Sequence, residues 1–382
     1  MSPTATWSFP THIRFGAGRI NEIAEACASA GISRPLLVTD RGLGTHSITN
    51  RALDLLEAAD FGRALFSDVD PNPNEANLGA GVEAFRSGRH DGVVAFGGGS
   101  ALDLAKMVAF MAGQSRPVWD FEDIGVWWRR ANSEAIFPSV AIPTTAGTGS
   151  EVGRASVLTN SETHEKKIIF HPKVLPAEVI ADPELTTGMP PEITAGTGMD
   201  AFAHCLEAFC SPHYHPMSQG IALEGMRLVK ENLPKAYETP NDLDARAHMM
   251  SAAMMGATAF QKGLGAIHSL SHPIGARHHT HHGTTNAVVM QAVLEFNRPA
   301  IEDHMRKIAA YLEIGDGYDE VYHFIGDLNK RLGIPPDLTA LGVVDADREA
   351  LLDGALRDPS CGGNPVELTR EALGLLLDKL LD

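Results

Sequence analysis

Short apolar runs alternate with amphipathic stretches through the first half of the chain, and this alternation constrains the fold more than any other feature. Each apolar run has the length and composition of a buried strand. The runs are Pro35–Asp40, Ala64–Val69, Gly92–Phe96 and Val140–Ile142. The stretches with helical spacing are Asn21–Ala30, Ile48–Ala58 and Asn77–Ser87. This order predicts a Rossmann-like parallel sheet covered by helices on both faces.

The pattern changes near Asp182-Pro183, after which helical spacing replaces strand-like runs. The predicted helices are Glu192–Cys210, Pro216–Leu233, Leu243–Lys262, Ile301–Leu312, Asp319–Leu332 and Leu368–Leu381. A chain of 382 residues is also too long for one ordinary core. We therefore expect an α/β domain over residues 1–182 and an all-helical domain over residues 183–382.

The charge and the cysteines limit the partners and the compartment. A formal net charge of −17 repels phosphate backbones and anionic lipid heads, so neither nucleic acid nor a membrane is expected as a partner. No run of about 18 apolar residues is present to span a bilayer. Met1–Trp7 lack the features of a secretory leader, and the four cysteines form no Cys-x-x-Cys pair. We expect a cytoplasmic protein.

Three consecutive glycines and Ser100 lie between the strand at 92–96 and a helical pattern at 101–112. Without Cβ atoms, the turn Gly97-Gly98-Gly99 lets backbone N–H groups approach a phosphate, and the helix N-terminus adds a favourable dipole. The alternative is a tight turn that needs glycine only for steric reasons. The run does not match Gly-x-Gly-x-x-Gly, so its position carries the prediction of a dinucleotide site. We expect Ser100 to be the N-cap of the helix.

Two further segments follow predicted strands. Pro143–Glu151 (PTTAGTGSE) offers hydroxyl and backbone donors to the same crevice. Asp40 ends the run at 35–40, where a carboxylate can accept a hydrogen bond from a ribose hydroxyl. Taken alone, Asp40 is more typical of a turn. Its occurrence together with the glycine turn and the 143–151 segment, each of which follows a predicted strand, favours a role in nucleotide binding.

A carboxylate and several histidines in the second half have the spacing of metal ligands. Asp200 and His204 are four residues apart in a helical pattern, and His268 and His272 repeat that spacing. One carboxylate with several imidazoles suits iron(II) or zinc(II), with a position open for a substrate oxygen. A single such pair is more often a surface hydrogen bond, and the run Ala276–His282 (ARHHTHH) is also typical of a solvated loop. Spacing alone leaves open which two bind among His268, His272, His278, His279, His281 and His282.

These segments, taken in order, resemble the iron-containing (group III) alcohol dehydrogenases. The matches run nearly from end to end, and their number and order make the resemblance specific. They are Pro10–Gly18, Asp40, Asp70–Pro73, Gly97–Lys106, Pro143–Glu151, Asp182-Pro183, Gly198–His204, Gly265–His282 and Asn364-Pro365. The resemblance implies a dehydroquinate synthase-like fold with an α/β N-terminal and an all-α C-terminal domain.

The family resemblance also implies roles for individual residues. A divalent metal, iron(II) first and zinc(II) second, would be held by Asp200, His204, His268 and His282. His272 would lie unligated beside the nicotinamide and substrate as a catalytic residue. An aspartate at position 40 would favour NAD over NADP by repelling a 2′-phosphate. The cofactor contacts would be Asp40, Asn72, Gly97, Gly98, Gly99, Ser100, Asp103, Thr144, Thr145, Thr148 and Lys167, or Lys166 if the match is shifted by one residue.

The implied activity is an NAD-linked alcohol dehydrogenase or aldehyde reductase acting on a primary alcohol, in a homodimer or larger homo-oligomer. Departures from the family pattern, Gly153-Arg154 and Arg277-His278, lie where substrate would bind. With the Trp127–Arg130 run they favour an alcohol with an anionic end, unless these arginines are only solvated surface. The alternatives are a dehydroquinate synthase-like lyase, which recycles its NAD, and a non-catalytic nucleotide- or metal-binding protein.

Overall fold

The computed structural model describes residue 9 and residues 11–381, which form two compact units. One unit comprises residues 11–145 and 149–187, and the other comprises residues 9, 146–148 and 188–381. Met1–Trp7, on which the expectation about a leader rests, lie outside the described residues, as does Pro10 at the start of one matching segment. Within the described part, no helix is long and apolar enough to cross a membrane.

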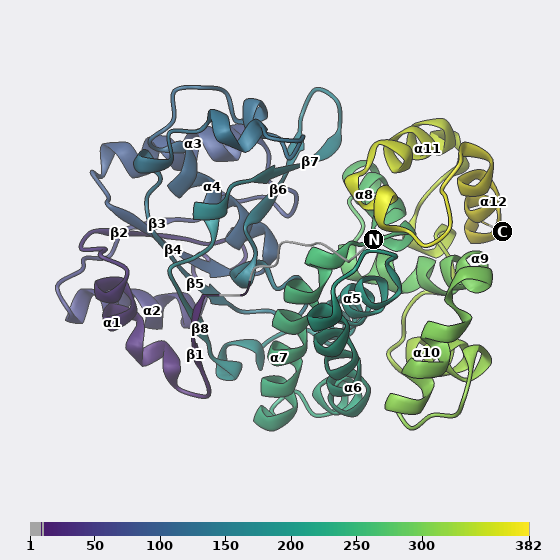
Figure 1. Ribbon diagram of the computed structural model, residues 1–382. Coiled ribbons are helices and arrows are strands. Elements are labelled where there is room, and N and C mark those ends of the chain that lie inside the picture. Colours follow the sequence, from purple (N-terminus) through teal and green to yellow (C-terminus); the bar gives the residue numbers. More distant parts are fainter. Residues whose placement is uncertain (1–8, 10, 382) are drawn as a thin grey trace. The chain divides into compact units, whose positions relative to one another are not determined.

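The first unit contains a six-stranded sheet with the strand order β1-β8-β5-β4-β2-β3 (Figure 1), in which every pair is parallel. The strands are β1 (His12–Phe15), β2 (Pro35–Val38), β3 (Leu65–Phe66), β4 (Gly92–Gly97), β5 (Ser139–Pro143) and β8 (Glu178–Ala181). The four predicted runs form β2, β3, β4 and β5, although β3 is only two residues long. Every residue of β2, β4 and β5 is buried, as expected for strands covered on both faces.

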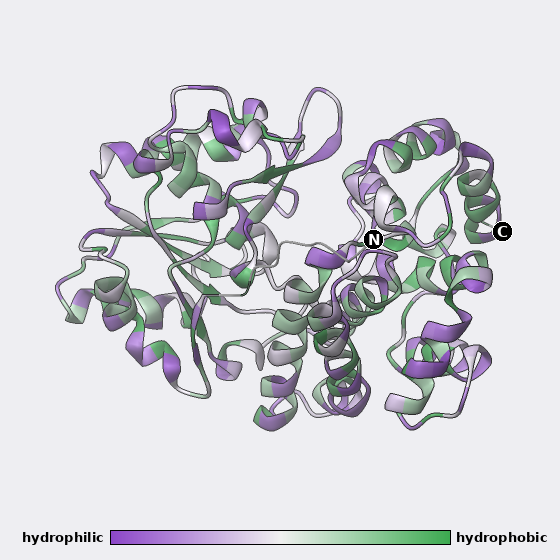
Figure 2. Cartoon of the chain, viewed as in Figure 1, coloured by the Kyte–Doolittle hydropathy of each residue, from purple (hydrophilic) through white to green (hydrophobic). Residues whose placement is uncertain are grey.

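Helices cover both faces of this sheet (Figure 1). They are α1 (Ile23–Ser29), α2 (Ser47–Ala58), α3 (Glu75–Ser87) and α4 (Gly99–Met111). Residues of α1 and α2, such as Ile23 and Leu53, share a core cluster with Val94 and Phe96 of β4. Helix α3 begins two residues before the predicted start because Asn74 caps it with a capping box. The strands are mainly hydrophobic and the outer helix surfaces mainly hydrophilic (Figure 2), so the core follows the predicted pattern.

A two-stranded antiparallel hairpin was not predicted. It consists of β6 (Ala155–Asn160) and β7 (Glu165–Phe170), with Ala155 opposite Phe170 and Asn160 opposite Glu165. Neither strand gives a continuous apolar run in the sequence, because β6 contains serine, threonine and asparagine and β7 begins with a glutamate and two lysines. Most residues of both strands are only half-buried. The hairpin follows directly on the 143–151 segment and carries Lys167.

The second unit is helical from residue 188 onward, so the expected fold class is confirmed. Its helices are α5 (Pro191–Cys210), α6 (Pro216–Glu238), α7 (Leu243–Ala259), α8 (Ala266–His278), α9 (His282–Tyr311), α10 (Tyr318–Arg331), α11 (Arg348–Arg357) and α12 (Arg370–Leu381). Helices α8 and α11 were not predicted, and α9 begins long before the predicted start at Ile301. Internal prolines, Pro273 in α8 and Pro299 in α9, together with many polar residues, conceal these helices in the sequence.

The C-terminal end of α5 is held by a buried lysine. Lys262 is 2% exposed and donates its ammonium group to the carbonyls of Ala208 (2.8 Å) and Phe209 (2.9 Å). A cation at this end of a helix satisfies carbonyls that have no intrahelical partner and opposes the helix dipole favourably. The C-terminal end of α5 is therefore held in place by Lys262.

Candidate metal centre and cofactor loops

Helix α5 presents three buried polar side chains on one face. Asp200 and His204 are 3% and 4% exposed, and Glu207, three residues further on, is 7% exposed. Residues three and four apart on a helix are neighbours, so the spacing itself places them together. His204 Nε2 lies 3.7 Å from Asp200 Oδ1.

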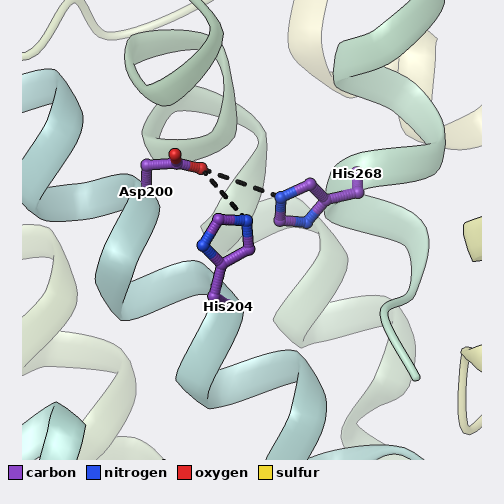
Figure 3. Close-up of side chains that lie close together, drawn as sticks. All are labelled: Asp200, His204 and His268. Carbon is purple, nitrogen blue, oxygen red and sulfur yellow. Dashed lines mark ion pairs between the residues drawn. The ribbon is translucent and has the colours of Figure 1, made fainter. Parts of the chain in front are cut away.

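Two further imidazoles converge on the same carboxylate oxygen. His268 Nε2, from the first turn of α8, lies 3.7 Å from Asp200 Oδ1, and His282 Nε2, from the first residue of α9, lies 3.5 Å from it. Figure 3 shows Asp200 and His204 projecting from α5 toward His268. The structure thus brings together all four side chains that the family resemblance assigns to the metal, although His282 is 78 residues from His204 in the sequence.

The donor set fits one divalent transition metal. The ligand atoms of Asp200, His204 and His268 lie within 4.8 Å of one another. Ligand atoms about 2.1 Å from a common ion are separated by roughly 3–4 Å, which matches the distances to Asp200 Oδ1. Three imidazoles with one carboxylate are ligands that iron(II) and zinc(II) both accept.

The electrostatics of the cluster also call for a cation. Burial opposes ionisation of Asp200, yet the histidines His204, His282 and His268 hold its pKa far below the usual range. Burial lowers the pKa of His204 to about 4, against the attraction of Asp200. Burial would lower the pKa of His268 too, but the charge of Glu207 and the contacts with Asp200 raise it to about 10. Without a metal, the buried carboxylate of Asp200 therefore holds positive charge on the neighbouring imidazoles, most strongly on His268, and a bound divalent cation would replace that charge.

Two polar residues that sequence reasoning missed hold the ligand residues. Glu207 Oε2 accepts a hydrogen bond from His268 Nδ1, and Asn286 Nδ2 donates to Asp200 Oδ1 (2.8 Å). Helical spacing could have identified both residues, since Glu207 is seven residues after Asp200 and Asn286 is four residues after His282. Each spacing places the residue on the same helix face as a ligand.

His272 lies beside the cluster without joining it. Its ring stacks on that of His282, with centroids 5.3 Å apart and planes at 14°. Its Nδ1 is 2.7 Å from Oδ2 of Asp358, whose Oδ1 accepts from the backbone N–H of Ser360. Asp358 is 9% exposed and comes from just after α11, so no sequence spacing pointed to it. The carboxylate holds the ring, which leaves Nε2 as the nitrogen free to exchange a proton.

The remaining candidate histidines have other contacts. His281 is the N-cap of α9, and its Nδ1 accepts from the N–H of Thr284. His278 lies 3.4 Å from a carboxylate oxygen of Asp347. His279 ends α8 in a left-handed conformation (φ 55°) and is exposed. Of the six histidines that spacing left open, His268 and His282 are the two whose Nε2 atoms lie 3.7 Å and 3.5 Å from Asp200 Oδ1, and their assignment as metal ligands stays a prediction.

The glycine turn follows β4 as predicted. Gly97 has φ +142°, a conformation that side chains disfavour, and a Cβ there would lie 2.8 Å from the Cβ of Ala101. Its carbonyl accepts from the N–H of Thr144 at the end of β5 (3.0 Å). The N-cap prediction was wrong: α4 begins at Gly99 with Gly98 as its N-cap. Ser100, one residue inside the helix, instead donates its hydroxyl to the carbonyl of Pro71.

Several predicted cofactor residues gather around this turn at the carboxyl ends of the strands. A Cβ on Gly97 would be 3.4 Å from Asp40 Oδ2, and one on Gly98 would be 3.3 Å from Thr145 Cγ2. Asp40 Oδ1 accepts from the N–H of Leu43 (3.0 Å), so the residue also serves its turn. Asn72 is half-buried directly after Pro71. Thr148 belongs to the 146–148 loop, which groups with the helical unit.

Asp103 and Lys167 already have protein partners. The two oxygens of Asp103 accept from the hydroxyl of Ser150 and the N–H of Val157, and Lys106 Nζ lies 3.3 Å from Oδ1. These contacts join α4 to the segment after Gly149. Lys167 forms ion pairs with Glu122 (3.3 Å) and Glu165 (3.0 Å). Contacts of Asp103 and Lys167 with a cofactor stay predictions.

A buried carboxyl in the same region gives a pH-dependent stability. Burial raises the pKa of Glu151 from 4.5 to about 7, against the attraction of Lys106. The folded chain therefore binds more protons than the unfolded chain between these values, so this stabilisation is full below pH 4.5 and is lost as the pH rises through 7. In Glu151→Gln we expect the Tm difference, variant minus wild type, to increase across that window in thermal melts. A difference that stays constant with pH would contradict the assignment.

The comparisons with known proteins identify the family. A family model described as iron-containing alcohol dehydrogenase matches residues 10–183, and the C-terminal model of the Fe-containing alcohol dehydrogenase family matches residues 194–381. The chain belongs to the iron-containing alcohol dehydrogenase family. A relative from Cupriavidus necator, 4-hydroxybutyrate dehydrogenase, is 40% identical over 367 residues, which cover 94% of each chain.

Solved structures of this family have the same fold. A 1,3-propanediol oxidoreductase structure aligns with a TM-score of 0.93 at 31% identity and covers 99% of this chain and 100% of its own. Sulfoacetaldehyde reductase from Bifidobacterium kashiwanohense, in complex with NAD+, aligns with a TM-score of 0.88 at 31% identity over 99% of both chains. Membership makes this chain an enzyme of the alcohol dehydrogenase type, and it favours that activity over the lyase alternative.

Proposed function

We propose that the chain interconverts a primary alcohol and its aldehyde by hydride transfer to or from NAD, with one divalent metal held by Asp200, His204, His268 and His282. The single observation that carries this proposal is the convergence of three imidazole Nε2 atoms on Asp200 Oδ1. Iron(II) is the first candidate, since the family models are those of iron-containing enzymes, and zinc(II) is the second. When bound, the ion supplies Lewis acidity that lowers the pKa of an alcohol hydroxyl.

The chain's own residues supply binding and proton transfer. Backbone N–H groups of the Gly97–Gly99 turn and the N-terminus of α4 bind the pyrophosphate of NAD. Asp40 accepts from a ribose hydroxyl and disfavours a 2′-phosphate, which makes NAD the preferred cofactor. His272, oriented by Asp358, receives the hydroxyl proton on Nε2 and returns it during aldehyde reduction. The remaining predicted cofactor contacts are Asn72, Ser100, Asp103, Thr144, Thr145, Thr148 and Lys167.

A turnover assay tests this function. Purified protein loaded with iron(II) is given short primary alcohols with NAD or NADP, and NADH formation is followed by absorbance. We expect one NADH per alcohol oxidised and a higher kcat/KM with NAD than with NADP. A lyase of the dehydroquinate synthase type recycles its NAD, so product without net NADH would favour that alternative, and no turnover would favour a binding protein.

We extend the proposal to an alcohol with an anionic end. The 4-hydroxybutyrate and sulfoacetaldehyde in the names of two similar proteins each carry a negative charge at the end opposite the reacting carbon. Arg277 is exposed in the last turn of α8, the helix of His268 and His272. The Arg154 guanidinium lies over the ring of Phe170. Arg129 and Arg130 also lie over rings, those of Trp128 and Trp127, but both are exposed, whereas Arg154 is half-buried and Arg277 shares a helix with His268 and His272. The case for Arg129 and Arg130 is therefore weaker.

The substrate prediction needs a neutral analogue of equal shape. We expect kcat/KM for 4-hydroxybutyrate to exceed that for 4-hydroxybutanamide by about 10–100-fold, since a charged hydrogen bond contributes about 1.5–3 kcal/mol. Arg154→Met and Arg277→Met are then compared with the wild type. The variant that brings the ratio of the two kcat/KM values close to one identifies the arginine that binds the carboxylate. Arg129→Met is the control and should leave the ratio unchanged. Equal kcat/KM values in the wild type would rule out an anionic subsite.

The assembly and the compartment complete the proposal. The family resemblance supports a homodimer or a larger homo-oligomer, which light scattering of the purified protein can determine. All four cysteines are free, and three of them are buried, as in proteins of a reducing compartment. We therefore place the enzyme in the cytoplasm.

A further inference from the structure

Glu207 touches two parts of α8 at once. It lies on α5 in line with Asp200 and His204, and its side chain is 6% exposed. Oε2 accepts from His268 Nδ1, and Oε1 accepts from the backbone N–H of Ile267 (2.8 Å). From this arrangement we propose that Glu207 is a positioning residue, which holds His268 in the orientation that metal binding requires. The inference rests on the proposed metal site.

The first contact sets the histidine ring. A carboxylate only accepts hydrogen bonds, so the proton between Glu207 Oε2 and His268 stays on Nδ1, and Nε2 remains directed at Asp200 Oδ1 (3.7 Å). A carboxylate behind a ligating imidazole fixes the ring and raises its basicity as a ligand. Without Glu207 the Nδ1 side of the ring loses its hydrogen-bond partner among the described residues, and the ring keeps its Nε2 contact with Asn286 (3.3 Å) and its stacking on His204.

The second contact sets the helix that carries the ring. Ile267 lies in the first turn of α8, where backbone N–H groups have no intrahelical partner and a negative charge is favourable. Gly265, just before the helix, leaves room for this approach, since a Cβ there would lie 3.1 Å from Glu207 Oε1. One side chain therefore determines both the position of the α8 N-terminus and the orientation of His268.

Asn364 provides a matched control. Its Oδ1 accepts from the N–H of Ala266 (3.1 Å), so it caps the same turn of α8. Its other hydrogen bonds go to Asn297 and the carbonyl of Val366, and none goes to a proposed ligand residue. Loss of Asn364 removes a cap of α8 as loss of Glu207 does, but it leaves the His268 contact in place.

The experiment measures metal retention rather than turnover. Wild type, Glu207→Ala, Glu207→Gln and Asn364→Ala are loaded with zinc(II), and zinc transfer to a chromogenic chelator is followed alongside the Tm of the metal-free proteins. Glutamine cannot satisfy both contacts, because its amide nitrogen would face a donor. We expect both Glu207 variants to bind zinc about 10–100-fold more weakly than wild type. Asn364→Ala should bind zinc within about threefold of wild type, even if its Tm falls as much as the Tm of the Glu207 variants.

A second readout separates orientation from stability. With cobalt(II) in place of zinc, the visible absorption reports the geometry of the ligands. We expect the spectrum to change in Glu207→Gln and to stay as in wild type in Asn364→Ala. The inference is overturned if the Glu207 variants retain zinc as tightly as Asn364→Ala and show the wild-type cobalt spectrum. If wild type itself fails to bind zinc or cobalt, the proposed metal site is wrong, and the inference falls with it.

Discussion

Replacing His268 by alanine is expected to lower kcat/KM for alcohol oxidation on the order of 10³-fold or more. The variant removes one of three imidazoles directed at Asp200 Oδ1 and leaves Glu207 without its partner. The Lewis acidity assigned to the metal contributes several kcal/mol, and each 1.36 kcal/mol is about tenfold in rate. The measurement combines steady-state kinetics with elemental analysis, which should find less than one metal ion per chain.

Cofactor affinity is the control for this variant. The glycine turn and Asp40 belong to the other compact unit, so NAD binding, followed by fluorescence titration, should change less than about threefold. His323→Ala serves as a control histidine variant, because His323 is exposed in α10 and its ring contacts Tyr322 rather than a proposed ligand. Near-normal turnover in His268→Ala would mean that the histidine cluster does not participate in catalysis.

Replacing Gly283 by alanine should destabilise the helical unit by about 3 kcal/mol and weaken metal binding together. Gly283 follows His282 at the start of α9, and a Cβ there would lie 2.1 Å from the carbonyl oxygen of Gly196 and 2.9 Å from the Cβ of Asp200. Backbone atoms cannot move aside as a side chain can, so α9 and α5 must separate, and overpacking of this kind costs about 1–3 kcal/mol. We expect Tm to fall by roughly 6–12 °C.

Another helical glycine isolates the effect of this contact. Gly220 lies inside α6 and is exposed, and a Cβ at this position would meet no other atom within 4 Å. Gly220→Ala should therefore stabilise the protein by about 0.5–1 kcal/mol, as alanine does in an unstrained helix. If thermal melts show Gly283→Ala to be as stable as Gly220→Ala, the close approach of α5 and α9 at Asp200 is incorrect.

The parts of the fold that sequence alone predicted are those with strong hydrophobic periodicity. The runs that became β2, β4 and β5 are buried throughout, so apolar composition identified them directly. Helix α8 was not predicted, because Pro273 and the buried histidines and serines of this helix interrupt the spacing of apolar residues. The hairpin β6–β7 was not predicted, because most of its residues are half-buried and many are polar. Tertiary packing determines the secondary structure of such segments, and the local sequence pattern gives little information about that packing.

Local spacing predicted the two candidate ligands on α5 but not the choice of the other two. Within α5, spacing placed Asp200 beside His204, and the same rule identifies Glu207 once the helix is known. The choice of His268 and His282 depends on how α8 and α9 pack against α5, and only the family resemblance anticipated it. Asp358 reaches His272 from 86 residues away and has no signal in its own surroundings. Long-range contacts of this kind require the fold.

Metal removal and restoration tests the central claim most directly. The purified enzyme is stripped with a chelator, its metal content is measured, and turnover is assayed before and after one equivalent of iron(II), zinc(II) or manganese(II) is added. We predict that turnover disappears with the metal and returns with one equivalent of iron(II) in the wild type, but not in His268→Ala. Full turnover in protein shown to contain no metal would contradict the account.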